Sequence, residues 1–261
     1  MDVSKRHRGT PKCPLPSSTP TLPILITARL ASSRLPQKHL LHLAPGQPSI
    51  VSLIARLRGV ELPLVLCIPE GPDDEPLWRV AVAEHIGCTR GDAENVLRRY
   101  AQAMAQLATA GAIIIDADDV FVSVEAIRRI AEIYVNEDMI RFSGMAYGGA
   151  PYFLSCKFVE TLLAHGASPN GWSAVLDEVP GNKLTLSDFS VQPEEQCYRL
   201  SLDYPDDLRF LGHLYSVLGP RTPHIEVIRY ITAHKAALMR EFPAMFDGSI
   251  AEQARQHLIR S

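Results

Sequence analysis

Three basic residues lie within ten positions directly after a short apolar run, and their spacing suits the binding of phosphate. Residues 28–38 read ARLASSRLPQK and contain Arg29, Arg34 and Lys38 among small side chains. Arginine and lysine bind phosphate through charge-assisted hydrogen bonds, and small residues let the backbone approach a ligand closely. A triphosphate is therefore a fitting ligand, whereas composition alone also allows a solvated basic loop.

Carboxylates gather in two other places. Asp116, Asp118 and Asp119 directly follow the apolar run 112–115, and Asp203 stands shortly before Asp206 and Asp207. Crowded carboxylates repel one another unless a cation or hydrogen bonds offset the repulsion, and their hard oxygen atoms suit Mg²⁺. The first group fits either a magnesium site or a solvated acidic turn before a helix, and Asp203 alone fits a helix cap.

Short runs of β-branched residues alternate with segments of helical period, and this order predicts an α/β fold with a mostly parallel sheet flanked by helices. Functional groups in such folds collect at the carboxyl ends of the strands, so the basic and acidic segments are expected at one edge. The expected strands are 24–27, 62–68, 113–117, 139–143, 151–156 and 196–202, and the expected helices are 49–58, 73–86, 92–108, 156–164 and 205–218.

Residues 28–38 resemble the signature R-x-x-S-x-R-L-P-x-K of the cytidylyltransferases that activate sugar acids, a group that includes CMP-Kdo synthetase, acylneuraminate cytidylyltransferase and SpsF-type enzymes. The resemblance implies a Rossmann-like nucleotide-diphospho-sugar transferase fold of the GT-A-like type. It also implies that this loop wraps the phosphates of CTP. The residues to which it assigns nucleotide binding here are Ala28, Arg29, Ser32, Arg34 and Lys38.

A second segment, residues 90–100, reads RGDAENVLRRY and looks like the SpsF-type sequence R-G-S-x-x-D-V-L-x-R-Y. The resemblance implies that Arg90, Gly91 and Arg99 line the nucleotide pocket. The match departs at Asp92 and Asn95, where the family has Ser and Asp. Taken without the family, Asp92 is a good N-cap and the two arginines 98–99 belong to a solvated helix face.

Both acidic segments also resemble family motifs. Residues 116–120 are similar to T-G-D-x-P, and residues 202–208 are similar to V-D-T-P-E-D-L. The resemblance implies that Asp118 and Asp203 hold one Mg²⁺, and Asp116, which replaces the family's Thr, is assigned to the nucleotide. Arg34, Lys38 and Asp118 are then the catalytic residues, because in-line attack on the α-phosphorus of CTP needs positioning and charge neutralisation rather than a nucleophilic residue.

The segment expected to face the acceptor differs from that of SpsF-type chains. Those chains read roughly G-L-D-V-E-V, whereas residues 149–154 here read GAPYFL and lack both acidic positions. A small anionic acceptor would meet less repulsion at such a site, so we expect a phosphonate or a sugar acid. The basic residues that could contact it, or could equally be ordinary surface residues, are Arg141, Lys157, His165 and Lys183.

Two other function classes fit part of the pattern. A metal-dependent glycosyltransferase that uses a nucleotide sugar would carry an Asp-x-Asp such as residues 116–118, but it would not be expected to carry the basic loop 29–38. A non-catalytic nucleotide-binding module would explain the departures at Asp92, Asn95, Asp116 and Val120. The retained residues of the basic loop and the two acidic motifs favour the enzyme.

The composition is that of an ordinary globular protein of 261 residues, with 46% hydrophobic residues and a formal net charge of -3. A charge so near neutral argues against nucleic acid as a partner, and the apolar runs are too short to span a membrane. Five scattered cysteines predict reduced, mostly buried thiols and a cytoplasmic protein. We expect a flexible, basic, Pro-rich tail over 1–22, a nucleotidyltransferase domain over 23–218 and a helical extension over 219–261. The family resemblance further implies a homodimer.

Overall fold

A seven-stranded sheet forms the centre of the molecule in the computed structural model, which describes residues 22–168 and 171–246. The strand order is β5-β4-β1-β6-β8-β7-β9, and every neighbouring pair is parallel except the two that involve β8. The predicted mostly parallel sheet is therefore confirmed. The strands are β1 (Ile24–Thr27), β4 (Leu64–Pro69), β5 (Gly87–Gly91), β6 (Gly111–Asp116), β7 (Met139–Phe142), β8 (Tyr152–Ser155) and β9 (Lys183–Leu186).

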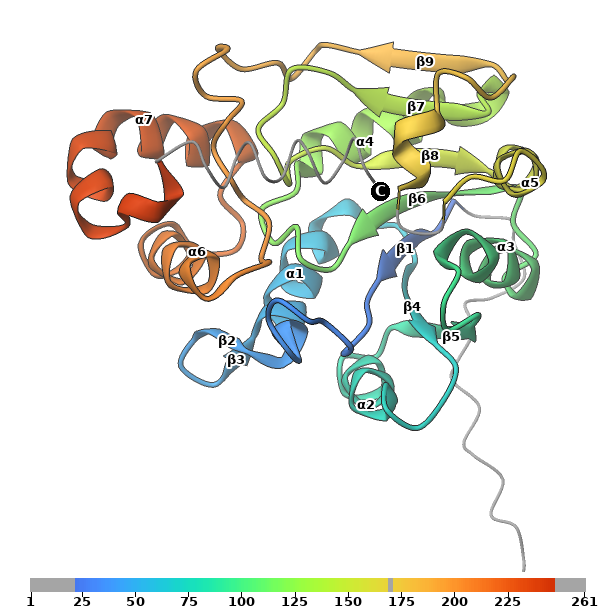
Figure 1. The fold of residues 1–261 in the computed structure, drawn as a ribbon, viewed down its shortest axis with the longest axis horizontal. Helices are drawn as coiled ribbons and strands as arrows, with labels where there is room; N and C mark the ends of the chain where they lie inside the picture. Colours follow the sequence, from blue (N-terminus) through green and yellow to red (C-terminus); the bar gives the residue numbers. More distant parts are fainter. Residues whose placement is uncertain (1–21, 169–170, 247–261) are drawn as a thin grey trace, which may run out of the picture.

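Helices cover both faces of this sheet because successive strand residues point to opposite sides. In β1, Ile24 and Ile26 pack with α1, α2 and α4, whereas Leu25 packs with α3 and α5 on the other face. Figure 1 shows the two layers on either side of the strands. The helices are α1 (Ser49–Leu57), α2 (Glu75–Ala83), α3 (Val96–Gln106), α4 (Val124–Ile133) and α5 (Cys156–Ala164).

A further apolar cluster lies at one end of the sheet, where α6 (Pro205–Leu218) and α7 (His224–Glu241) pack together (Figure 1). Phe210 of α6 and Ile228 of α7 belong to this cluster, together with Leu35 from the basic loop and Phe121 from the turn after β6. The hairpin of β2 (His42–Ala44) and β3 (Gln47–Pro48) packs beside α6. Helices α6 and α7 thus support two of the segments that carry the predicted site residues.

Three strand assignments differ from the sequence prediction. Strand β5 has a glycine at each end, and β9 is a short strand at the opposite edge, so neither has the apolar run by which the other strands were found. Residues 196–202, predicted as a strand, form only an isolated bridge between Arg199 and Tyr147. This segment is buried by α6 and α7 rather than by a sheet, which explains its apolar composition.

Among the described residues, Cys67, Cys156 and Cys197 are free thiols. Cys67 and Cys88 are buried, as predicted for most of them, whereas Cys156 is half-buried and Cys197 is exposed. None of the helices in residues 22–168 and 171–246 is long and apolar enough to cross a membrane. The tail over 1–21, with Cys13, and residues 247–261 lie outside the described residues.

Candidate active site

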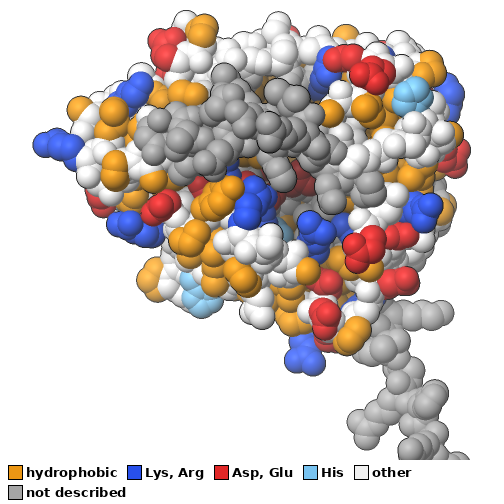
Figure 2. Space-filling view, viewed as in Figure 1, with side chains coloured by type: hydrophobic (Ala, Val, Ile, Leu, Met, Phe, Trp, Pro, Cys, Tyr) orange, Lys and Arg blue, Asp and Glu red, His pale blue; other side chains and the backbone are white. Residues whose placement is uncertain are grey.

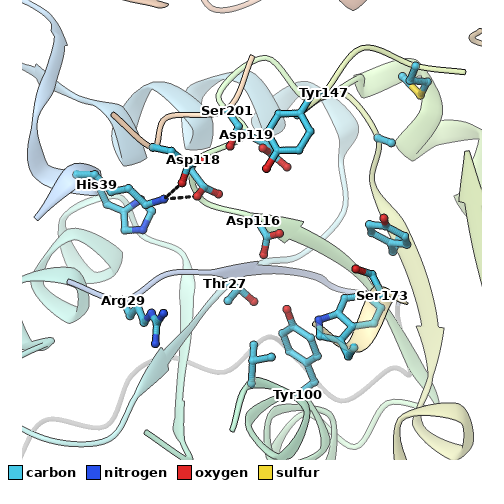
Figure 3. A pocket seen from close by; sticks show the side chains of 18 of the residues that line it. Thr27, Arg29, His39, Tyr100, Asp116, Asp118, Asp119, Tyr147, Ser173 and Ser201 are labelled. Carbon is cyan, nitrogen blue, oxygen red and sulfur yellow. Dashed lines mark hydrogen bonds and ion pairs between the residues drawn. The ribbon is translucent and has the colours of Figure 1, made fainter. Parts of the chain in front are cut away.

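A cavity of about 710 Å³ opens at the carboxyl edge of β1 and β6, where the functional groups were predicted from the sequence. Basic side chains lie beside acidic ones near the centre of this face (Figure 2). The close view in Figure 3 shows Thr27, Arg29, Asp116 and Asp118 around one space. The remaining wall comes from the start of α3, the loop between β7 and β8, the segment around Trp172 and the segment before α6.

The basic loop after β1 is held by its apolar residues. Leu30 and Leu35 are buried in two different clusters, and the backbone N–H of Leu30 donates to Asp74 at 2.7 Å. With the apolar residues buried, Arg29, Arg34 and Lys38 are left to line the cavity. The loop therefore gathers three cations on one wall without a regular strand or helix over most of its length.

Backbone hydrogen bonds bring the two acidic motifs together. The N–H of Ala117 donates to the carbonyl oxygen of Thr27 at 2.9 Å, which continues the β1–β6 pairing past the strand end. The N–H of Leu202 donates to the carbonyl oxygen of Asp118 at 3.0 Å, so the residue before Asp203 lies against the first motif. Carboxylates 85 positions apart in sequence thereby share one wall of the cavity.

Lys38 lies between these carboxylates. Its ammonium group bonds Asp118 and also donates to Oδ1 of Asp203 at 3.0 Å, while Arg34 donates to the same Oδ1 at 2.7 Å. Burial favours loss of the Lys38 proton, but Asp118 and Asp203 outweigh it and raise the pKa of Lys38. The ammonium is therefore charged at neutral pH. The sequence-predicted residues Arg34, Lys38, Asp118 and Asp203 thus form one ionic network.

Arg199 completes that network and is a residue that the sequence analysis missed. Its guanidinium donates to Oδ2 of Asp203 at 2.6 Å and to Oδ1 of Asp207 at 2.8 Å, and all three side chains are at most 4% exposed. Asp207 also accepts from the backbone N–H groups of Asp203 and Tyr204 at the start of α6. Arg199 and Asp207 fix the orientation of Asp203. The signal that could have indicated this ion pair was the position of Arg199, four residues before Asp203.

A divalent cation has a fitting donor set here. Single carboxylate oxygens of Asp116, Asp118 and Asp119 lie within 4.8 Å of one another, and oxygen donors of this kind suit Mg²⁺. Burial and the charge of Asp118 raise the pKa of Asp116 to about 7 and also raise the pKa of Asp119. Burial acts in the same direction on Asp118, but Lys38 outweighs it and lowers the pKa of Asp118. Lys38 therefore favours the ionised form of Asp118.

The opposite wall of the cavity is aromatic. Tyr100 of α3, Tyr152 of β8 and Trp172 lie on this wall, and the Trp172 ring meets the other two at steep angles, with centroids 6.3 and 5.4 Å away. Tyr152 lies in the segment 149–154 that was expected to face the acceptor, whereas Trp172 belongs to no recognised motif and was not predicted. The loop before β8 approaches closely at Gly148, where φ is +83° and a Cβ would lie 2.8 Å from the backbone of Leu200.

Several sequence-predicted residues lie elsewhere. The guanidinium of Arg90 is paired with Glu75 at 2.6 Å, and Arg90, Gly91, Ala28 and Ser32 are not among the residues that line the cavity. Arg99 does line it, and only 3% of its surface is exposed. The solvated face expected from composition is therefore wrong for Arg99, although Arg98 is exposed.

The cap of α3 also differs from the residue-based expectation. The helix begins at Val96 with Asn95 as its N-cap, because the Asn95 side chain accepts from the N–H of Arg98. Asp92 instead accepts from the backbone N–H groups of Glu94 and Asn95 and so stabilises the preceding turn. None of the four basic residues suggested for the acceptor lies on the cavity wall, namely Arg141, Lys157, His165 and Lys183.

Comparisons with known proteins agree with this geometry. Residues 24–155, about half of the chain, match the sequence model of a family described as cytidylyltransferase. The match includes β1 with the basic loop, β6 with the first acidic motif, and the strands as far as β8. No match to the chain was found among curated proteins.

Solved structures share the fold at low identity. A cytidylyltransferase from Leptospira borgpetersenii has a TM-score of 0.73 at 17% identity, covering 83% of this chain and 95% of its own. A CMP:2-keto-3-deoxy-manno-octonic acid synthetase complexed with CTP has a TM-score of 0.55 at 12% identity, covering 76% and 99%. Rv0371c of Mycobacterium tuberculosis complexed with manganese has a TM-score of 0.53 at 17% identity, covering 74% and 98%.

Proposed function

Because the chain belongs to the cytidylyltransferase family and is a nucleotidyltransferase, we propose that it transfers CMP from CTP to a small anionic acceptor, a phosphonate or a sugar acid, with release of pyrophosphate. The observation that carries this proposal is the ionic network at the carboxyl edge of the sheet. Lys38 and Arg34 meet Asp118 and Asp203 there, on the wall of a cavity large enough for a nucleotide.

The triphosphate is assigned to the basic wall. Arg29, Arg34 and Lys38 present cations from one loop, and a triphosphate is the anion that this concentration of charge suits. In the described structure Lys38 is neutralised by two carboxylates, so incoming phosphate oxygens would replace those partners rather than meet an isolated charge. Arg34 and Lys38 then neutralise charge that develops on the leaving pyrophosphate.

The metal is assigned to Asp118 and Asp203, as the resemblance implied. Lys38 already brings both carboxylates to one ammonium group, so they lie near enough to share a cation once phosphate draws Lys38 away. A bound Mg²⁺ would supply charge neutralisation and orientation of phosphate oxygens. The structure of a fold relative complexed with manganese supports the use of a divalent cation.

We assign cytosine as the base of the nucleotide because the chain belongs to the cytidylyltransferase family. The relative complexed with CTP supports this assignment, and the preference belongs to the proposal. Arg99 at the start of α3 lines the cavity beside the aromatic wall and is the candidate among the α3 residues for contact with the nucleotide. The acceptor then attacks the α-phosphorus in line, and no nucleophilic side chain is required.

The test is pyrophosphate release with each of the four nucleoside triphosphates, with Mg²⁺ or with EDTA, against sugar acids, sugar phosphates and phosphonates. We expect release with CTP and Mg²⁺ and with one acceptor class. Tight nucleotide binding without release from any combination would contradict the enzyme proposal and favour a binding module. Transfer of sugar from a nucleotide sugar would favour a glycosyltransferase instead.

A further inference from the structure

Asp116 has no ion-pair partner among the described residues, as is also true of Asp119 and Glu94 on the cavity lining, but Asp116 is the one that Figure 3 shows beside Tyr100. Asp118 and Asp203 pair with Lys38, and Asp207 pairs with Arg199. The Asp116 side chain, at the carboxyl end of β6, is exposed to the cavity. Arg99 also lines the cavity, but its guanidinium donates to the carbonyl oxygens of Asp92 and Ala93.

The aromatic wall lies beside Asp116. Figure 3 shows Tyr100 pointing toward Asp116. Tyr152 lines the same cavity as Asp116 and Tyr100, and burial together with the charge of Asp116 raises the pKa of both tyrosines. Trp172 meets Tyr152 at an interplanar angle of 69° and Tyr100 at 88°. Three rings from three different elements thus stand at steep angles to one another next to one unpaired carboxylate.

Aromatic rings beside a carboxylate are a fitting site for an organic cation. The faces of Trp and Tyr rings attract ammonium groups, and quaternary ammonium groups are bound in this way by clusters of aromatic side chains. The carboxylate supplies the counter-charge that the ring quadrupoles lack. A metal ion would not use the rings, and the phosphates of the nucleotide would be repelled by Asp116.

We propose that Asp116, Tyr152 and Trp172, supported from behind by the buried Tyr100, bind an ammonium group of the acceptor, so that the acceptor is a small phosphate or phosphonate that carries a protonated or quaternary amine. This inference rests on the proposed function. It narrows the acceptor from any small anion to a zwitterion. A sugar acid is disfavoured because it offers no cation to offset the charge of Asp116.

The transfer step is balanced without a further reactant. An anionic oxygen of the acceptor's phosphate or phosphonate group forms a bond to the α-phosphorus of CTP. The bond from that phosphorus to the oxygen bridging the β-phosphate breaks, and the electron pair leaves with pyrophosphate. The ammonium group stays intact and serves only to hold and orient the acceptor.

The experiment compares acceptors that differ in charge alone. Phosphocholine and its neutral analogue 3,3-dimethylbutyl phosphate form one pair, 2-aminoethylphosphonate and propylphosphonate form the other, and a sugar acid is the third arm. Pyrophosphate release with CTP and Mg²⁺ gives kcat/KM for each. We expect the charged member of at least one pair to be preferred by about tenfold or more. The two pairs distinguish a quaternary phosphate ester from a primary aminophosphonate.

Variants assign the preference to this wall. Trp172→Leu and Asp116→Asn are expected to reduce the ratio of charged to neutral acceptor toward one. Trp78→Leu, which removes the chain's other tryptophan and lies outside the cavity, is expected to keep the ratio. In Trp78→Phe, Trp172 is the sole tryptophan, so phosphocholine should quench its fluorescence whether or not turnover occurs.

Three outcomes would overturn the inference. One is equal or better turnover of the neutral analogues or the sugar acid, which would leave the proposed function standing. Another is an Asp116→Asn variant whose requirement for Mg²⁺ rises while the acceptor ratio is unchanged, which would make Asp116 a metal ligand. The third is fluorescence of Trp172 that is unaffected by the ammonium compounds. Absence of pyrophosphate release with every acceptor would contradict the proposed function itself.

Discussion

The two walls of the cavity differ in whether their carboxylates have ion-pair partners. On the basic wall, Arg34 and Lys38 are paired with Asp118 and Asp203, and Arg199, which lies outside the cavity lining and also pairs with Asp207, holds Asp203 in position. On the aromatic wall, Asp116 has no ion pair within the part of the chain that the structure describes. The paired wall fits chemistry common to the family, and the unpaired wall fits recognition of a particular acceptor.

Loss of Lys38 is the largest expected effect. Lys38→Ala leaves Asp118 and Asp203 without their shared cation and removes a donor for the phosphates. We expect turnover to fall by about 10²-fold or more, which is typical of losing one positioned charge at a transition state. Pyrophosphate release measures it, and circular dichroism checks the fold. Lys157→Ala is the matched control, because this exposed lysine pairs with Asp138 away from the cavity, and it should retain activity.

Loss of Arg199 tests whether the paired wall depends on the buried pairs behind it. Arg199→Met leaves Asp203 and Asp207 buried without this cation, and breaking a buried pair typically costs about 3 to 5 kcal/mol of unfolding free energy. Urea unfolding measures the cost. Arg199→Lys should recover part of the stability while still requiring more Mg²⁺ for half-maximal activity. Wild-type values for both quantities in Arg199→Met would show that Asp203 does not need this support.

Acid should destabilise the paired wall through His39. This buried ring lies next to Lys38, and burial lowers its pKa from 6.5 to about 4. The unfolded chain therefore binds a proton between these values while the folded chain does not. The contribution of the neutral His39 ring to the free energy of unfolding is complete above pH 6.5. It falls as the pH drops toward 4, by up to about 3 kcal/mol. His39→Gln should flatten this part of the profile of unfolding free energy against pH. A profile identical to that of the wild type would assign the loss of stability to other groups such as His224.

The smallest expected effect concerns Arg141, a residue that sequence reasoning offered for the acceptor. It pairs with exposed Asp177 and bonds Thr185 outside the cavity, and exposed pairs of this kind contribute less than about 1 kcal/mol. We expect Arg141→Ala to leave kcat/KM within about twofold. A large increase in KM for the acceptor alone would place the acceptor on this side of the sheet and contradict the division.

The sequence predicted the centre of the fold and the basic wall because their signals are local. Strand β1 is a continuous apolar run, and the basic loop and both acidic motifs follow predicted strands directly. The rule that strand ends meet at one edge then brings Lys38 and Asp118 together correctly. The central strands and the basic wall were therefore predicted mainly from short apolar runs that have charged residues at their ends.

The parts that the sequence did not predict depend on distant contacts. Trp172 lines the cavity only because the segment after α5 folds back over Tyr152, and nothing near Trp172 in the sequence indicates this. Arg199 lies in an apolar stretch that resembles a strand but packs against α6 and α7. Arg90 matches a family motif, yet Glu75 holds its side chain away from the cavity.

The measurement that tests the account most directly follows the α-phosphate of CTP. With CTP labelled at the α-phosphorus, Mg²⁺ and the acceptor panel, we predict that the label appears in the acceptor product and that unlabelled pyrophosphate is released. Asp118→Asn should reduce that transfer by about 10²-fold or more while the protein remains folded. Label that stays in CTP, or transfer that is equally fast in Asp118→Asn, would contradict nucleotidyl transfer at the paired wall.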